Sequence, residues 1–172
     1  VDAVPFELEN GPSVAGDVAS RLTAVRPDVG LLHAVQDRTR EKRALAELGL
    51  PLPAFRPIAS EDDLAEAARA LPGAGVLKTS SFGYDGKGQV RVESSGGLGD
   101  AWASIGRVPA VLEALVPFVE EISVVVARGV EGDDAVYETI TNAHADHLLD
   151  VTVCHADLDE DALAEAHRIA RA

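Results

Sequence analysis

Cysteine is nearly absent from this chain, and positive charge and long apolar runs are also scarce. Cys154 is the single cysteine, which excludes a disulfide framework and a zinc site built from cysteines. No apolar run approaches about 18 residues, so the sequence predicts no membrane-spanning helix. With 15 Lys and Arg against 29 Asp and Glu, the net charge of −14 argues against nucleic-acid and anionic-membrane partners. We therefore expect a soluble, cytoplasmic protein without such partners.

Among the positively charged residues lysine is rare, and most of the lysines lie at one glycine-rich loop. Residues 76–78 are typical of a short buried strand, and residues 89–92 of a second strand. The chain has three lysines, and two of them, Lys78 and Lys87, flank or lie in this loop, whereas Lys42 lies elsewhere. The loop also holds three glycines, Gly83, Gly86 and Gly88. A hairpin needs only about two to five connecting residues, so the longer loop predicts a flap over a ligand. Because glycines let backbone N–H groups turn toward an anion, the ligand that the loop favours is a phosphate.

The loop differs from two widespread phosphate-binding motifs. A Walker A loop needs Gly-Lys followed by Ser or Thr and a helix, whereas Lys87 precedes Gly88 and a strand. The Rossmann fingerprint has another glycine spacing and also opens a helix. A surface hairpin without a ligand is the alternative that the loop by itself leaves open.

The hydrophobic pattern predicts alternating helices and strands around a core. At 172 residues and 47% hydrophobic composition, the chain is long enough to bury one. We expect helices over 13–22, 28–35, 37–48, 60–71, 97–105 and 157–172, and strands over 1–4, 25–27, 55–58, 76–78, 89–92, 110–112, 120–128 and 135–137. The expected helix caps are Ser13, Asp28, Asp37 and Ser60 with Asp63, Gly49 is expected just after a helix end, and Trp102 is expected in the core.

The helix expected after Asp37 begins with a cluster of cations. Its first half carries Arg38, Arg40, Lys42 and Arg43 in an otherwise acidic chain. Cations near a helix start oppose the helix dipole, so at least one of them is expected to have a partner. Arg38, which is closest to the start, is the candidate.

Two acids and a histidine in the second half of the chain are further candidates. Glu113 ends an expected buried strand and Glu121 opens the next one, so the two can face one cleft. A buried carboxylate needs hydrogen-bond donors, which ribose hydroxyls or an adenine amino group would supply; exposed strand ends are the equally weighted alternative. We expect His144 to line a nucleotide cleft. A His/Asp metal cluster is a minor alternative, since the spacings of His144, His147, Asp150, His155 and Asp157 match no metal-binding pattern, and we predict no metal ligands here.

Several motifs together resemble those of a known family. They are FELEN (6–10), QDRTREK (36–42), LGLPLPAF (48–55), VLKTSSFGYDGKGQ (76–89), LEALVPFVEEISVVVARG (112–129) and NAH (142–144). Their order closely resembles the carboxyaminoimidazole ribonucleotide synthases, ATP-grasp ligases of purine biosynthesis. GYDGKGQ is specific for that family, and the resemblance covers almost the whole chain.

The resemblance implies a site, a reaction and partners. The ATP-binding residues it implies are Arg38, Lys78, Gly83, Tyr84, Asp85, Gly86, Lys87, Gly88, Gln89, Glu113, Ala114, Leu115, Val116, Glu121 and His144. Arg38 and Lys78 would contact phosphates, Glu113 to Val116 adenine, and Glu121 ribose. The implied reaction activates bicarbonate with ATP to carboxyphosphate and carboxylates the amino group of aminoimidazole ribonucleotide. Mg²⁺ is implied as cofactor and a homodimer as the assembly of the full-length protein.

The resemblance also implies an incomplete chain of the α/β class. We expect the end of a Rossmann-like domain over 1–36, the small ATP-grasp subdomain with the flap over 37–108, and the start of the large subdomain over 109–172. The family's chains are roughly twice as long, so the Mg²⁺ ligands are expected beyond residue 172 and the isolated chain is expected to be inactive. Another ATP-grasp ligase, such as a formate-dependent one, and a non-catalytic nucleotide-binding module are the alternatives.

Overall fold

The computed structural model describes residues 2–6, 10–83, 87–145, 148–154 and 158–172. The chain divides into two compact units, Val1–Leu115 and Val116–Ala172, and each is described here by itself. Within the described residues, no helix is long and apolar enough to cross a membrane.

The first unit begins with a small parallel βαβ motif. β1 (Ala3–Pro5) pairs in parallel with β2 (Ala24–Arg26), and α1 (Ser13–Ser20) connects them. α2 (Val29–Val35) follows, and its expected cap is confirmed because the Asp28 carboxylate accepts a 2.7 Å hydrogen bond from the Gly30 N–H. The prediction that Ser13 caps α1 is wrong. The helix begins one residue earlier than expected, so Pro12 is the cap residue and Ser13 lies within the first turn.

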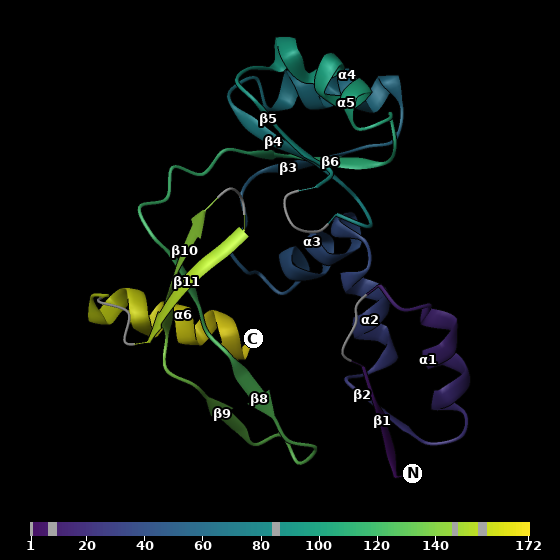
Figure 1. Ribbon diagram of the computed structural model, residues 1–172, viewed down its shortest axis with the longest axis vertical. Coiled ribbons are helices and arrows are strands. Elements are labelled where there is room, and N and C mark those ends of the chain that lie inside the picture. Colours follow the sequence, from purple (N-terminus) through teal and green to yellow (C-terminus); the bar gives the residue numbers. More distant parts are fainter. Residues whose placement is uncertain (1, 7–9, 84–86, 146–147, 155–157) are drawn as a thin grey trace. The chain divides into compact units, whose positions relative to one another are not determined.

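A four-stranded antiparallel sheet forms the centre of the first unit. Its strand order is β3 (Phe55–Ile58), β6 (Ala110–Ala114), β4 (Gly75–Thr79) and β5 (Gln89–Val92). α4 (Glu61–Ala70) and α5 (Leu98–Ser104), which follows the 3-10 turn Ser95–Gly97, lie together over one face of this sheet (Figure 1). The expected strands at 55–58 and 89–92 and the helices that cover them are confirmed.

The hydrophobic core lies between this sheet and its two helices. Its buried members are Ile58, Ala67, Leu77, Val92, Leu98, Ala101, Trp102, Ala110 and Leu112. Trp102 is only 4% exposed, and its indole N–H donates a 2.9 Å hydrogen bond to the Val108 carbonyl. The prediction of Trp102 as a core residue is therefore confirmed.

α3 (Arg38–Glu47) is fastened at its start to the end of β4. The Asp37 carboxylate caps it by accepting a 3.0 Å bond from the Arg40 N–H, as expected. The Arg38 N–H donates to the Ser80 carbonyl at 2.8 Å, and the Ser81 hydroxyl donates to the Gln36 carbonyl at 3.1 Å. The first turn of α3 is thus held beside the glycine-rich loop.

The described residues of the second unit form two small antiparallel sheets and one helix. β11 (Leu148–Cys154), β10 (Ile140–Ala145) and β7 (Glu121–Ser123) form a three-stranded sheet, and β8 (Val126–Arg128) pairs with β9 (Asp134–Val136). The prediction of one continuous strand over 120–128 is wrong, because the two halves of that apolar run find partners in different sheets. Apolar character predicts extended backbone, but the pairing partners decide where a strand ends.

The sequence did not predict the pairing of β10 with β11. It also did not predict the residue that caps the last helix. Asn142 and His144 lie in β10, where their polarity obscures the alternation typical of a strand. α6 (Glu160–Arg171) is capped by Asp159, whose carboxylate accepts a 2.8 Å bond from the Ala162 N–H. The expected start at Asp157 lies outside the described residues.

Candidate functional site

The base of the glycine-rich loop is closed by hydrogen bonds to its own strand and to α3. The Thr79 N–H donates to the Gly88 carbonyl at 2.7 Å. The Arg38 guanidinium donates from Nε to the Thr79 carbonyl at 3.1 Å and from Nη2 to the Gly83 carbonyl at 3.5 Å. The expectation that Arg38 has a partner is confirmed, and its partners are two carbonyl groups of the loop.

Two of the loop glycines are closely packed against neighbouring side chains. A Cβ on Gly83 would lie 3.0 Å from Nη2 of Arg38, and a Cβ on Gly88 would lie 2.7 Å from Oγ1 of Thr79. Gly88 also has a φ of +72°, which side chains disfavour. The described part of the loop is therefore packed against Thr79 and Arg38.

The other loop residues of the predicted site are exposed or lie outside the described residues. Lys87 and Gln89 are exposed, while Tyr84, Asp85 and Gly86 lie outside the described residues. The hypothesis of a closing flap concerns mainly these last three positions, so it stays a prediction.

Beside the loop, two lysines share one buried carboxylate. Glu113 is 7% exposed, and its Oε2 lies 3.1 Å from Nζ of Lys78 while its Oε1 lies 3.0 Å from Nζ of Lys42. Glu113 is paired with Val76 across β4 and β6, so Lys78, two residues further along β4, lies on the same face. The sheet register thus brings together two residues that the sequence singled out separately.

Lys42 is the member of this cluster that the sequence reasoning missed. It lies one helical turn after Arg38, so both cations are on one face of α3. Its Nζ also lies 5.6 Å from the centroid of the Phe55 ring. The i,i+4 spacing from Arg38, together with the scarcity of lysine, was the available signal.

The charge of the cluster favours an anion. Two ammonium groups and one carboxylate leave a formal surplus of one positive charge, and Arg38 adds another at the loop base. Partly buried charges interact more strongly than solvated ones because water screens them less. A phosphate group is the ligand that such a surplus, set beside a glycine-rich loop, would attract.

Two backbone N–H groups that follow Glu113 already donate hydrogen bonds within the protein. The Ala114 N–H donates to the Ala54 carbonyl at 2.8 Å, and the Leu115 N–H donates to the Ala74 carbonyl at 3.0 Å. Val116 begins the second unit and is exposed. Adenine recognition by Glu113 to Val116 stays a prediction, and it would depend on backbone groups other than these two N–H groups.

In the second unit, Glu121 and His144, which the sequence singled out separately, lie close together. β7 pairs with β10 so that Asn142 is opposite Glu121, and His144 Nδ1 lies 3.7 Å from Oε1 of Glu121. The Asn142 amide donates to the same oxygen at 3.4 Å and to the Ser123 hydroxyl at 2.7 Å. Both side chains are partly exposed, His144 at 38% and Glu121 at 45%.

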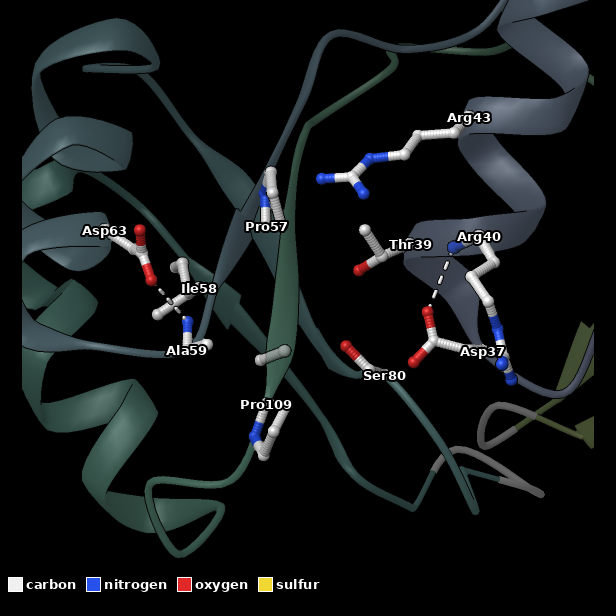
Figure 2. A pocket seen from close by; sticks show the side chains of 11 residues that line it. Asp37, Thr39, Arg40, Arg43, Pro57, Ile58, Ala59, Asp63, Ser80 and Pro109 are labelled. Atoms are coloured by element: carbon white, nitrogen blue, oxygen red, sulfur yellow. Dashed lines mark hydrogen bonds between the residues drawn. The ribbon is translucent and has the colours of Figure 1, made fainter.

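A separate cavity of about 480 Å³ lies between α3 and the edge of the sheet in the first unit (Figure 2). It is lined by Asp37, Thr39, Arg40, Arg43, Pro57, Ile58, Ala59, Asp63, Ser80, Pro109 and Ala110, a set that does not include the shared carboxylate or its two lysines. Figure 2 shows both of its carboxylates bonded to backbone N–H groups, Asp37 to that of Arg40 and Asp63 to that of Ala59. Its two arginines and two aspartates balance in formal charge, whereas the cluster around Glu113 has a positive surplus.

The described residues contain no group of three or more His, Cys, Asp or Glu side chains placed to hold a metal ion. His147, His155 and Asp157 of the minor metal alternative lie outside the described residues.

Comparison with known proteins gives consistent matches. The ATP-grasp domain family matches residues 43–172. N5-carboxyaminoimidazole ribonucleotide synthase from Pseudomonas aeruginosa is 37% identical over 165 residues, which are 96% of this chain and 46% of that protein. The enzyme of the same name from Brucella melitensis is 37% identical over 171 residues, 98% of this chain and 47% of that protein. The chain thus spans about half the length of the curated relatives it matches.

Solved structures give the same result. The ADP complex of an N5-carboxyaminoimidazole ribonucleotide synthetase matches with a TM-score of 0.92 and 32% identity, over 99% of this chain and 45% of that one. The corresponding protein from Thermus thermophilus matches with a TM-score of 0.88 and 30% identity, over 99% of this chain and 46% of that one. The similarity extends over both the loop region and the second unit.

Proposed function

The chain belongs to the ATP-grasp family, and from this premise we propose that it is the ATP-binding part of a 5-aminoimidazole ribonucleotide carboxylase. The predicted α/β fold of the ATP-grasp type is confirmed by the family match and by the similarity to solved structures. The activity itself is proposed, because the chain spans only about half of its relatives.

One observation carries the proposal: similarity to N5-carboxyaminoimidazole ribonucleotide synthases extends over nearly the entire chain at 37% identity. The cluster of Lys78, Glu113 and Lys42 beside a glycine-rich loop supports it independently. A relative at 32% identity was solved as an ADP complex, which supports ATP as the nucleotide here.

The proposed reaction has two steps. A bicarbonate oxygen attacks the γ-phosphorus of ATP, the bond to the β-phosphate oxygen breaks, and carboxyphosphate and ADP form. The amino group of aminoimidazole ribonucleotide then attacks the carboxyl carbon, phosphate leaves, and the nitrogen loses a proton to give the N5-carboxylated product.

The residues of this chain contribute positioning and charge. Phosphoryl transfer depends mainly on orientation and on neutralising the phosphate oxygens. Following the resemblance, we assign Lys78 and Arg38 to the phosphates, Glu121 to the ribose hydroxyls and His144 to the nucleotide. Within the first unit, Lys78 and Arg38 lie at the base of the loop, and within the second unit, His144 lies near Glu121. Mg²⁺ would neutralise phosphate charge; the described residues hold no cluster of three or more donors for it, and no step is assigned to it. The homodimer and the cytoplasmic location stay predictions.

The decisive experiment measures ADP release by the protein that carries this chain. We expect release with aminoimidazole ribonucleotide and bicarbonate together, and only background release when either is omitted. Formate with glycinamide ribonucleotide serves as the comparison for another ATP-grasp ligase. Release with that pair but not with the first would replace the proposed substrate while keeping the ATP site.

A further inference from the structure

We propose that Lys42 is a positioning residue: it retains the Glu113 carboxylate so that Lys78 can leave it for a nucleotide phosphate. This inference rests on the proposed function, since it assumes that a nucleotide binds beside the loop. It assigns a role to a residue that was not among the predicted ATP-binding residues.

The two lysines hold Glu113 in unequal ways. The Lys42 side chain is 12% exposed, comes from α3 and is covered by the Phe55 ring. The Lys78 side chain is 27% exposed and precedes Thr79, whose carbonyl marks the loop base. Lys42 is therefore the enclosed partner, and Lys78 is the partner with access to a ligand at the loop.

The shared carboxylate makes this division necessary. Each lysine occupies a different oxygen of Glu113, so either can leave without displacing the other. A buried carboxylate that loses all its partners is strongly destabilised. With Lys42 in place, Glu113 keeps one ammonium group when Lys78 turns toward a phosphate. Without Lys42, the same movement would leave Glu113 buried and unpaired.

The net charge leads to the same conclusion. The three side chains together carry a formal charge of +1, and removal of Lys42 lowers it to zero. Lys78 would then be fully engaged in a neutral pair with Glu113. Affinity for the phosphate part of a nucleotide should fall, while affinity for the nucleoside part should not.

The test compares ATP and adenosine binding by calorimetry in the protein that carries this chain. For Lys42→Met we expect the ATP affinity to fall about tenfold or more, with adenosine affinity changed less than about twofold. Lys42→Arg keeps the charge and is expected to recover most of the ATP affinity. Arg69→Met removes one positive charge from α4, where the Arg69 guanidinium donates to the Ala65 carbonyl of its own helix, and should bind ATP as the unaltered protein does.

A double variant separates positioning from a general loss of structure. In the Glu113→Gln background no carboxylate needs to be retained, so Lys42→Met should cost clearly less ATP affinity than it does when Glu113 is present. Circular dichroism checks that each variant is folded. Unchanged ATP affinity in Lys42→Met, or equal losses for ATP and adenosine, would overturn the inference. If the unaltered protein binds no ATP, the proposed function fails and the inference fails with it.

Discussion

Thr79 and Gly88 lie against each other at the base of the glycine-rich loop, through a backbone hydrogen bond and a close side-chain approach. The Thr79 N–H donates to the Gly88 carbonyl at 2.7 Å, and the Oγ1 of the same threonine lies 2.7 Å from where a Cβ on residue 88 would be. The φ of Gly88, +72°, adds a second reason for glycine. The loop therefore begins and ends at a fixed position beside the two lysines and the shared glutamate.

Gly88→Ala is expected to destabilise the first unit by roughly 2–5 kcal/mol, because the backbone strain of a positive φ adds to the overlap with Thr79. Chemical denaturation followed by circular dichroism measures this loss. Gly49→Ala is the matched control, since Gly49 has the same φ of +72° but no atom within 4 Å of its Cβ position. It should lose only about 1–2 kcal/mol. Equal losses in the two variants would mean that the contact with Thr79 is unimportant.

Leu77→Ala should cost about 2–5 kcal/mol of unfolding free energy, because Leu77 is fully buried between the sheet and its helices. Leu22→Ala, at a position that is 83% exposed, should change it by less than about 0.5 kcal/mol. Urea denaturation of both variants makes the comparison. A Leu77→Ala protein as stable as the Leu22→Ala protein would contradict the described core.

The stabilisation that Asp63 gives to the first unit should be lost in acid. The hydrogen bond from the Ser60 hydroxyl, with a further one from the Ala59 N–H, lowers the pKa of the Asp63 carboxyl below its ordinary value of 3.8. A lowered pKa means that the folded state favours the charged form. The stabilisation is therefore complete above pH 3.8 and is lost as the pH falls through the lower, folded-state pKa.

Asp63→Asn should flatten this part of the pH dependence, measured as unfolding free energy between about pH 5 and pH 2. Asp62→Asn, an exposed neighbour in the same helical turn, is the matched control and should keep the slope of the unaltered protein. The same slope in all three proteins would argue against the cap.

Hydrogen exchange should distinguish the two units. The buried hydrophobic side chains of the described residues all belong to Val1–Leu115, whereas the described residues of β11 are all exposed. Segments with few buried apolar contacts open at lower free energy. Amide protons of β4 and β6 should therefore exchange more slowly than those of β10 and β11, as measured by NMR or mass spectrometry. Equal protection would indicate that the second unit has a core of its own.

Much of the secondary structure was predictable because its signals are local. Asp28, Asp37 and the pair of Ser60 with Asp63 were predicted as helix caps, and in the structure their hydrogen bonds join residues only two or three positions apart. The run over 120–128 failed for the opposite reason. Its apolar residues predict extended backbone, but the division into β7 and β8 depends on strands further along the chain.

The candidate site was predictable in its parts. Arg38, Lys78, Glu113, Glu121 and His144 were all singled out from the sequence, and the sheet registers bring Lys78 to Glu113 and His144 to Glu121. Lys42 was missed because its importance depends on a carboxylate 71 positions away, as the numbers 42 and 113 show.

The sequence by itself determined which residues to single out and favoured a phosphate compound as ligand, from the glycine-rich loop and the placement of the rare lysines. Only the tertiary structure decided how the charges are distributed. Which ammonium group meets which carboxylate oxygen depends on the packing of α3 against the sheet and on the register of β4 with β6. Electrostatic partners are chosen by distance in space, and separation along the chain does not encode that distance.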